Sequence, residues 1–279
     1  MRSIEDIILA KDRRGISTVR SYLPDDFCKR AALLALSRVG PVLIVTGFYI
    51  KKAGKPETDG PPGALVLGEA LSRLGRDISY VTDEPSLSMM QTLASERGGR
   101  VLAFPVNDRV GSEARAKEIL SILNPSLLIS VERCGPTRDG RYLNLRSEDI
   151  SFATAKLDLL FQYHDSTIGI GDGGNEIGMG NVAHVIPQTV GLVDPCVTRA
   201  TELVIAGVSN WGAYGLVAAM SHLTGFKLLP SLDQEMELVE RVLALGAVDG
   251  ISGLAERSVD GFSQTQSQEV LLALQQSLT

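Results

Sequence analysis

The sequence predicts an α/β fold with a mostly parallel sheet, helices on both faces, Rossmann-like layering and an active site at the C-terminal ends of the strands. Short β-branched apolar runs without polar alternation recur along the chain, as is typical of strands buried on both faces. Segments of helical length separate these runs, which is the alternation expected of a parallel sheet covered on both sides. In such sheets, ligands bind beyond the carboxyl ends of the strands.

The apolar runs predict the strands of the sheet. Their ranges are Val42–Thr46, Ile78–Thr82, Val101–Phe104, Leu127–Val131, Thr167–Ile170 and Leu203–Ala206. Helices are expected between and after them, at Asp25–Arg38, Gly63–Leu74, Ser86–Arg97, Ser112–Leu123, Ile150–Tyr163 and Asn210–Leu223. We therefore expect residues 1–279 to form a single α/β domain, with minor helical elaborations at 1–38 and 231–279.

The last fifty residues predict two further helices. Ser231 and Gln234 have the spacing of a capping box, and the helix that they open should stop at Gly246. The segment Val259–Leu278 is rich in Gln and Ser, and its leucines fall at helical spacing. We interpret it as a helix that docks on the rest of the domain.

Composition excludes several classes of protein. The formal net charge is −6 and there is no basic block, which argues against nucleic acid as a partner. The apolar region Ala31–Ile50 is interrupted by Arg38, Gly40 and Pro41, so it is too broken to cross a bilayer. Three widely spaced cysteines favour a reducing compartment over a disulfide framework. We expect a cytoplasmic protein with a small-molecule substrate and no membrane partner; a homo-oligomer is compatible with the sequence.

The stretch from Gly169 to Asn181 is the most informative local feature. A buried strand ends at Asp172, and Asn175 and Glu176 follow among six glycines. The stretch formally fits a dinucleotide-binding fingerprint, but acids inside the turn would repel a pyrophosphate and the segment after it is a poor helix. We therefore expect no nucleotide cofactor, and a site for a cation, an ammonium group or proton transfer instead.

Other loops that leave the carboxyl ends of strands are also rich in polar residues. The long loop Gly47–Gly63 carries Thr58 and Asp59, and Glu132 and Arg133 follow the strand Leu127–Val131 directly. Arg141 lies further along that second loop, and Asn210 follows the last strand. These loops should converge on one edge of the sheet, as a rigid scaffold with a loop-built active site requires.

These blocks together resemble the D-glutamate cyclase family. The resemblance is carried by Gly169–Asn181, Glu57–Ala64, Val131–Arg133, Asp139–Tyr142 and Asn210–Tyr214, in order over most of residues 40–255. It implies cyclisation of D-glutamate to 5-oxo-D-proline with loss of water, by a chain that corresponds to the cyclase domain alone. Cys134-Gly135-Pro136 departs from the family pattern, in which a loop rich in Gly and Arg is expected.

The implied reaction needs a base for the ammonium, an acid for the departing oxygen and charge neutralisation for the carboxylate. A carboxylate base with a divalent cation or a strong acid meets these needs. The catalytic candidates are Asp172, Glu176, Glu132 and Asn175; the substrate-binding candidates are Thr58, Asp59, Arg133, Arg141, Gly173, Gly174 and Asn210. Asp172 and Glu176 are the tentative metal ligands, for Mg²⁺ or Mn²⁺ because no His/Cys cluster suggests zinc.

Purely structural roles for these residues stay open. Asp172 could cap its own turn, Asn175 could hold the turn, and Arg133 and Arg141 could form surface ion pairs. Two other functions also stay open: a magnesium-dependent enzyme acting on phosphates or nucleotides, and a non-catalytic protein that binds D-glutamate or 5-oxoproline.

Overall fold

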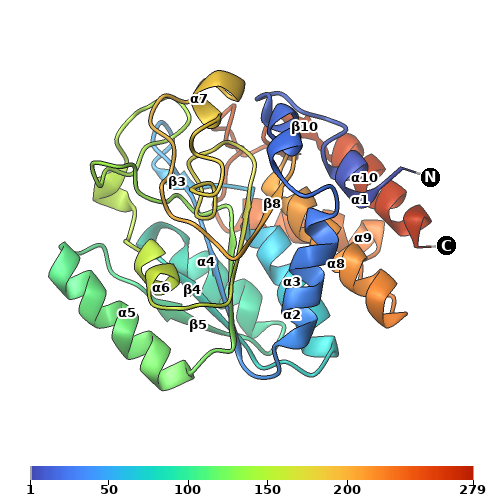
Figure 1. The fold of residues 1–279 in the computed structure, drawn as a ribbon, viewed down its shortest axis with the longest axis horizontal. Coiled ribbons are helices and arrows are strands. Elements are labelled where there is room, and N and C mark those ends of the chain that lie inside the picture. The colour runs from blue at the N-terminus through green and yellow to red at the C-terminus, as the bar shows by residue number, and fades with distance from the viewer. Residues whose placement is uncertain (1, 279) are drawn as a thin grey trace.

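The computed structural model describes residues 2–278 and has a parallel six-stranded sheet at its centre (Figure 1). The strands lie in the order β5-β4-β1-β6-β7-β8. Their bounds are β1 Val42–Thr46, β4 Ile78–Thr82, β5 Arg100–Ala103, β6 Leu127–Val131, β7 Thr167–Gly171 and β8 Glu202–Ile205. The predicted α/β class and all six predicted strands are confirmed, with ends shifted by at most one residue.

The strand order identifies the part of the sheet where a ligand is expected. The chain starts at β1, moves outward through β4 and β5, and then returns to place β6 on the other side of β1. The loops after β1 and β6 therefore diverge, and such a switch point is where open α/β sheets bind ligands. Between β1 and its helix lies a small hairpin, β2 Tyr49–Ile50 with β3 Lys55–Pro56.

Helices cover both faces of the sheet. Successive residues of a strand point to opposite faces, so apolar side chains of each strand pack on both layers of helices. In β1, Val42 and Ile44 pack on one core cluster, whereas Leu43 and Val45 pack on the other. The first face is covered by α2 Phe27–Ser37, α3 Pro61–Arg73, α4 Glu84–Ser95 and α8 Ser209–Thr224. The second is covered by α5 Arg109–Leu123, at the left of Figure 1, and by α6 Asp158–Gln162.

The two ends of the chain meet outside α8 (Figure 1). The elements there are α1 Ile4–Ile8, α9 Leu232–Ala244, the hairpin β9 Ser258–Val259 with β10 Phe262–Ser263, and α10 Gln264–Ser277. The 3-10 helix Ile16–Tyr22 packs against β8 and the short helix Ile186–Thr189 instead. Ser231 and Gln234 form the predicted capping box of α9, and Gly246 follows that helix with φ +104. The predicted docking helix is α10; it packs on α8 and α9 and starts after the β9–β10 hairpin.

The helix expected at Ile150–Tyr163 is largely absent. A 3-10 turn at Ser151–Ala153 and the short α6 replace it, and a four-residue helix, α7 Ile186–Thr189, follows β7. The backbone of Ala155 explains the break, since its N–H donates to Asp83 and its carbonyl accepts from Arg133. These bonds to distant side chains replace the i to i−4 bonds that a continuous helix would need.

Among the described residues, no helix is long and apolar enough to span a membrane.

Candidate functional site

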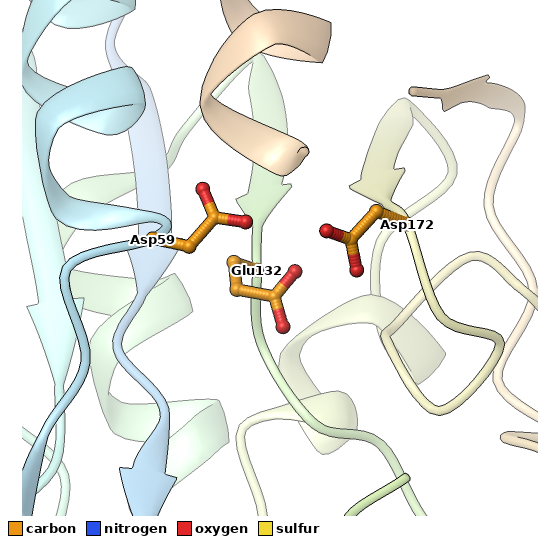
Figure 2. Close-up of side chains that lie close together, drawn as sticks. All are labelled: Asp59, Glu132 and Asp172. Carbon is orange, nitrogen blue, oxygen red and sulfur yellow. The ribbon is translucent and has the colours of Figure 1, made fainter. Parts of the chain in front are cut away.

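Three carboxyl groups converge at the switch point of the sheet (Figure 2). Asp59 lies just before α3, Glu132 directly follows β6, and Asp172 directly follows β7. One oxygen of each lies within 4.8 Å of one oxygen of the other two, and all three side chains are buried. Because β1, β6 and β7 are neighbours in the sheet, the parallel strands deliver these acids to the same point.

Asp59 is oriented by the first turn of α8. Its carboxylate accepts hydrogen bonds from the backbone N–H groups of Ser209 (2.9 Å) and Asn210 (2.8 Å). In return, the side-chain oxygen of Asn210 accepts from the backbone of Gly60 (3.0 Å) and Gly63 (2.8 Å), at the start of α3. The two helix N-termini thus cap each other, which satisfies donors that would otherwise be unpaired. Asn210 therefore acts on the site through Asp59 and the α3 backbone.

Glu132 reaches the cluster through an unusual backbone conformation. Its φ is +46, in the left-handed region that residues other than glycine rarely adopt. The hydroxyl of Ser209 donates to its Oε2 at 2.6 Å. Gly60 makes room for it, since a Cβ at that glycine would lie 2.8 Å from the Cβ of Glu132. Strain of this kind is typical of functional sites.

Asp172 and Glu176 have different surroundings although they are four residues apart. Glu176 accepts the backbone N–H groups of Asp172 (3.2 Å), Gly173 (2.7 Å) and Gly174 (2.8 Å), so both of its oxygens close the glycine turn. Asp172 forms an ion pair with Arg14 and interacts with the carboxyl group of Asp260; among the described residues its oxygens have no other hydrogen-bond partner. The structure does not place Glu176 in the trio of converging acids.

Three further charged residues lie beside the trio, and none of them is among the site residues predicted from the sequence. Arg14 bridges Asp172 and Asp260, and it contacts Asp260 at 2.8 Å. Glu57 is buried beside them and precedes Asp59 by two residues. Arg14 and Asp260 come from the two ends of the chain. Asp12-Arg13-Arg14-Gly15 and Asp260-Gly261 have the composition of turns, and this was their only local signal.

Crowding of buried acids shifts their protonation equilibria. Burial, followed by the negative charge of Asp260, raises the pKa of Asp59 to about 8. Burial and neighbouring carboxylates also raise the pKa of Glu57 and of Glu132. Burial raises the pKa of Asp172 although Arg14 opposes it, whereas at Asp260 the charge of Arg14 together with side-chain hydrogen bonds to Asp172, Arg14 and Glu57 outweighs burial and lowers the pKa. A single guanidinium is too little positive charge for this cluster, so protons or a cation must supply the rest.

A cleft with a volume of about 80 Å³ opens onto the cluster. At about 10–15 Å³ per water-sized probe, it has room for a small amino acid. One end of the cleft is lined by the acids Glu57 and Glu132 together with Arg14, and its wall includes Asn175. The remaining lining includes Lys51, Lys52, Asn144 and Arg146. The cleft therefore presents acids to a cation or ammonium group and basic side chains to a carboxylate.

Several other candidate residues form hydrogen bonds within the loops that surround the cleft. Thr58 donates from its hydroxyl to the carbonyl of Ser258 (3.0 Å), and Asn175 donates from its amide to the carbonyl of Leu143 (2.9 Å). Gly173 and Gly174 contribute their N–H groups to Glu176. Their roles are thus in the shape of the loops around the cleft.

The two candidate arginines do not join the acidic cluster. The guanidinium of Arg133 is buried and donates to Asp83 and to the carbonyls of Gly47 and Ala155. Arg141 is exposed and pairs with Asp139, with a longer contact to Asp194 at 3.7 Å. Neither arrangement leaves a guanidinium facing the cleft.

The trio suits a hard divalent cation. Mg²⁺ and Mn²⁺ prefer oxygen ligands, and Mg²⁺ binds them at about 2.0–2.1 Å, so two oxygens on one ion lie at most about 4.2 Å apart. The separations within 4.8 Å need only a small contraction to reach that limit. Asp172 is fully buried, and among the described residues its oxygens are met only by Arg14 and Asp260, which is a further mark of an incomplete site. Asp59, Glu132 and Asp172 are the residues that could hold such an ion.

Comparison with known proteins gives concordant matches. The family model described as "D-glutamate cyclase-like, C-terminal" matches residues 4–275. The human protein named "D-glutamate cyclase, mitochondrial" is 30% identical over 304 aligned positions, which cover 94% of this chain and 49% of the human protein. The chain therefore spans about half the length of the relative that it matches.

Proposed function

This chain belongs to the D-glutamate cyclase-like family, and from that premise we propose that it cyclises D-glutamate to 5-oxo-D-proline with loss of water. The observation that carries the proposal is the convergence of Asp59, Glu132 and Asp172 beside a cleft of amino-acid size. We further propose that these acids hold Mg²⁺ or Mn²⁺. The human relative bears the name of this activity, and the site supplies a chemistry that suits it.

The reaction exchanges one covalent bond for another and also transfers protons from nitrogen to oxygen. The α-nitrogen forms a bond to the carbon of the γ-carboxyl group, and one carbon–oxygen bond of that group breaks. The ammonium group gives up two protons, and the departing oxygen takes up two to leave as water, so there is no net release of protons. Carboxyl groups that can both accept and donate a proton are suited to this relay.

The chain's own residues divide these tasks. Glu132 faces the cleft, and its raised pKa makes its carboxylate form a stronger base for a proton of the substrate nitrogen. Glu57 also faces the cleft, and its raised pKa favours the protonated form that donates to the departing oxygen. A bound divalent cation would polarise the γ-carboxyl as a Lewis acid. The cleft holds the folded substrate so that the nitrogen meets the carbon of the γ-carboxyl group, and proximity of this kind is worth about 7–11 kcal/mol when geometry is maintained.

The direct test is incubation of pure protein with D-glutamate or L-glutamate, with Mg²⁺ or Mn²⁺ or after exhaustive chelation. Formation of 5-oxoproline is followed by chiral chromatography. We expect turnover of the D-isomer, because inverting the α-carbon moves the amine out of line with the γ-carboxyl. We expect chelation to abolish turnover and either ion to restore it. Full activity in metal-free protein would remove the cation from the proposal.

The same assay distinguishes the alternatives. Binding of D-glutamate without product at any metal concentration would identify a binding protein. Thermal protection by phosphate-bearing ligands, and none by D-glutamate, would identify an enzyme of phosphate or nucleotide chemistry.

A cytoplasmic location is also part of the proposal. It rests on three free, buried cysteines, which suit a reducing compartment. The human relative is named mitochondrial, so that location is the alternative. Fractionation of cells that express the full-length protein would discriminate between them.

A further inference from the structure

Arg14 connects the N-terminal part of the chain to the acidic cluster. Its guanidinium forms ion pairs with Asp172 and with Asp260, and its side chain is only 15% exposed. A turn built on Asp12 presents it, since that carboxylate accepts the backbone N–H groups of Arg14 (2.8 Å), Gly15 (2.9 Å) and Ser17 (2.8 Å). The backbone is thus organised to direct one guanidinium into the acidic cluster, where it also lines the cleft.

Arg14 and a divalent cation need the same carboxylate. Asp172 is one of the three converging acids, and among the described residues Arg14 is the one cation that forms an ion pair with it. A guanidinium in contact with an oxygen of Asp172 would lie close to an ion bound by that residue. Two positive charges at such a distance repel each other strongly in a site that excludes water.

We propose that Arg14 is a resident counter-cation that competes with the divalent cation for Asp172 and, once displaced, pairs with a carboxylate of the substrate. The first half rests on the proposed metal site, and the second on the proposed substrate.

The exchange of partners links the two ligands. Through its ion pairs with Asp172 and Asp260, Arg14 lowers the cost of burying so many acids. Binding of a cation releases the guanidinium from Asp172 while Asp260 keeps it beside the cleft. D-Glutamate carries two carboxylates and offers the replacement partner. Metal and dicarboxylate should therefore each tighten the binding of the other, as linkage requires.

The experiment measures Mn²⁺ binding by titration calorimetry in mildly alkaline buffer, so that protons compete little for the acids. It compares the wild-type chain with Arg14→Gln and Arg14→Lys. Arg13→Gln is the matched control, because it removes the same charge from the neighbouring position, where the side chain is exposed and packs over the ring of Phe262. Thermal denaturation with and without Mn²⁺ is measured on all four proteins.

Arg14→Gln should bind Mn²⁺ about tenfold or more tightly than wild type, and Arg14→Lys should lie between them. Arg14→Gln should melt lower than wild type without Mn²⁺ and gain more from its addition, whereas Arg13→Gln should match wild type in affinity. D-Glutamate should tighten Mn²⁺ binding several-fold in wild type and not in Arg14→Gln. Equal or weaker Mn²⁺ binding in Arg14→Gln would overturn the competition, and persistent linkage in that variant would overturn the carboxylate role.

These results are separable from the proposed function. Tighter Mn²⁺ binding in Arg14→Gln by a protein that forms no 5-oxoproline would support the competition and refute the cyclase activity. Turnover in wild type together with unchanged Mn²⁺ affinity in Arg14→Gln would do the reverse.

Discussion

Two arginines, Arg133 and Arg14, lie beside buried acids. They differ in how completely the charged and hydrogen-bonding groups around them are paired. Arg133 pairs with Asp83 and donates to two backbone carbonyls, and Asp83 also accepts the N–H of Ala155 at 3.0 Å. Arg14 faces a cluster of acids that it cannot neutralise alone, and among the described residues Asp172 has no partner besides Arg14 and Asp260. A nearly complete network of this kind stabilises a fold, whereas an incomplete one is where a ligand supplies what is missing. The contrast predicts different consequences for substitutions in the two clusters.

The largest expected effect is on turnover at Asp172. Asp172→Asn should slow formation of 5-oxo-D-proline by about 10²–10⁴-fold, because it removes a charged oxygen from the converging acids. The free energy of unfolding should change little, since one buried negative charge is lost from a crowded cluster. Rates and urea denaturation of the same preparation test this. A folded Asp172→Asn protein with the wild-type rate would mean that the incomplete cluster is not the active site.

Arg133 should matter for stability instead. Arg133→Met leaves the carboxylate of Asp83 buried without its cation, which should lower the free energy of unfolding by about 3–5 kcal/mol. Chemical denaturation measures the loss, and the double variant with Asp83→Asn should recover part of it. If Arg133→Met instead keeps its stability and raises the KM for D-glutamate, then Arg133 binds the substrate.

Glu235 provides a buried acid whose partner is a neutral amide. Burial raises its pKa from 4.5 to about 7, although a hydrogen bond from Gln264 opposes the shift. A folded-state pKa above the unfolded value means that this group's contribution to stability is complete below pH 4.5 and is lost as pH rises through 7. The loss should reach roughly 2–3 kcal/mol. Denaturation across this range should show a smaller fall for Glu235→Gln; an identical pH profile would contradict the shifted pKa.

The smallest expected effect separates Glu176 from Asp172. In Glu176→Gln an amide NH₂ faces backbone N–H groups of the glycine turn, which should cost about 1–3 kcal/mol of stability. Turnover should fall less than in Asp172→Asn, because the turn is loosened and no converging acid is lost. Collapse of turnover at unchanged stability would show that Glu176 takes part in the reaction directly.

Much of the fold and part of the site follow from local sequence. The strands could be predicted because Val42–Thr46 and its counterparts are short apolar runs, and burial on both faces of a parallel sheet demands that composition. Asp59, Glu132 and Asp172 could be singled out because each is an acid in a loop at the carboxyl end of a strand. Parallel strands bring such positions to one edge whatever the details of packing.

Only the tertiary structure decided which charged groups share a partner. The bridge that Arg14 forms between Asp172 and Asp260 joins the two ends of the chain, and no local pattern specifies that contact. The break in the helix expected at Ile150–Tyr163 likewise depends on bonds from Ala155 to residues far away in sequence. Sequence determines the chemical type of a side chain and its place on a strand or loop. Whether its charge is balanced depends on every group that folding brings within a few ångströms, which is why Glu176 and Asp172 look equivalent in sequence and differ in the structure.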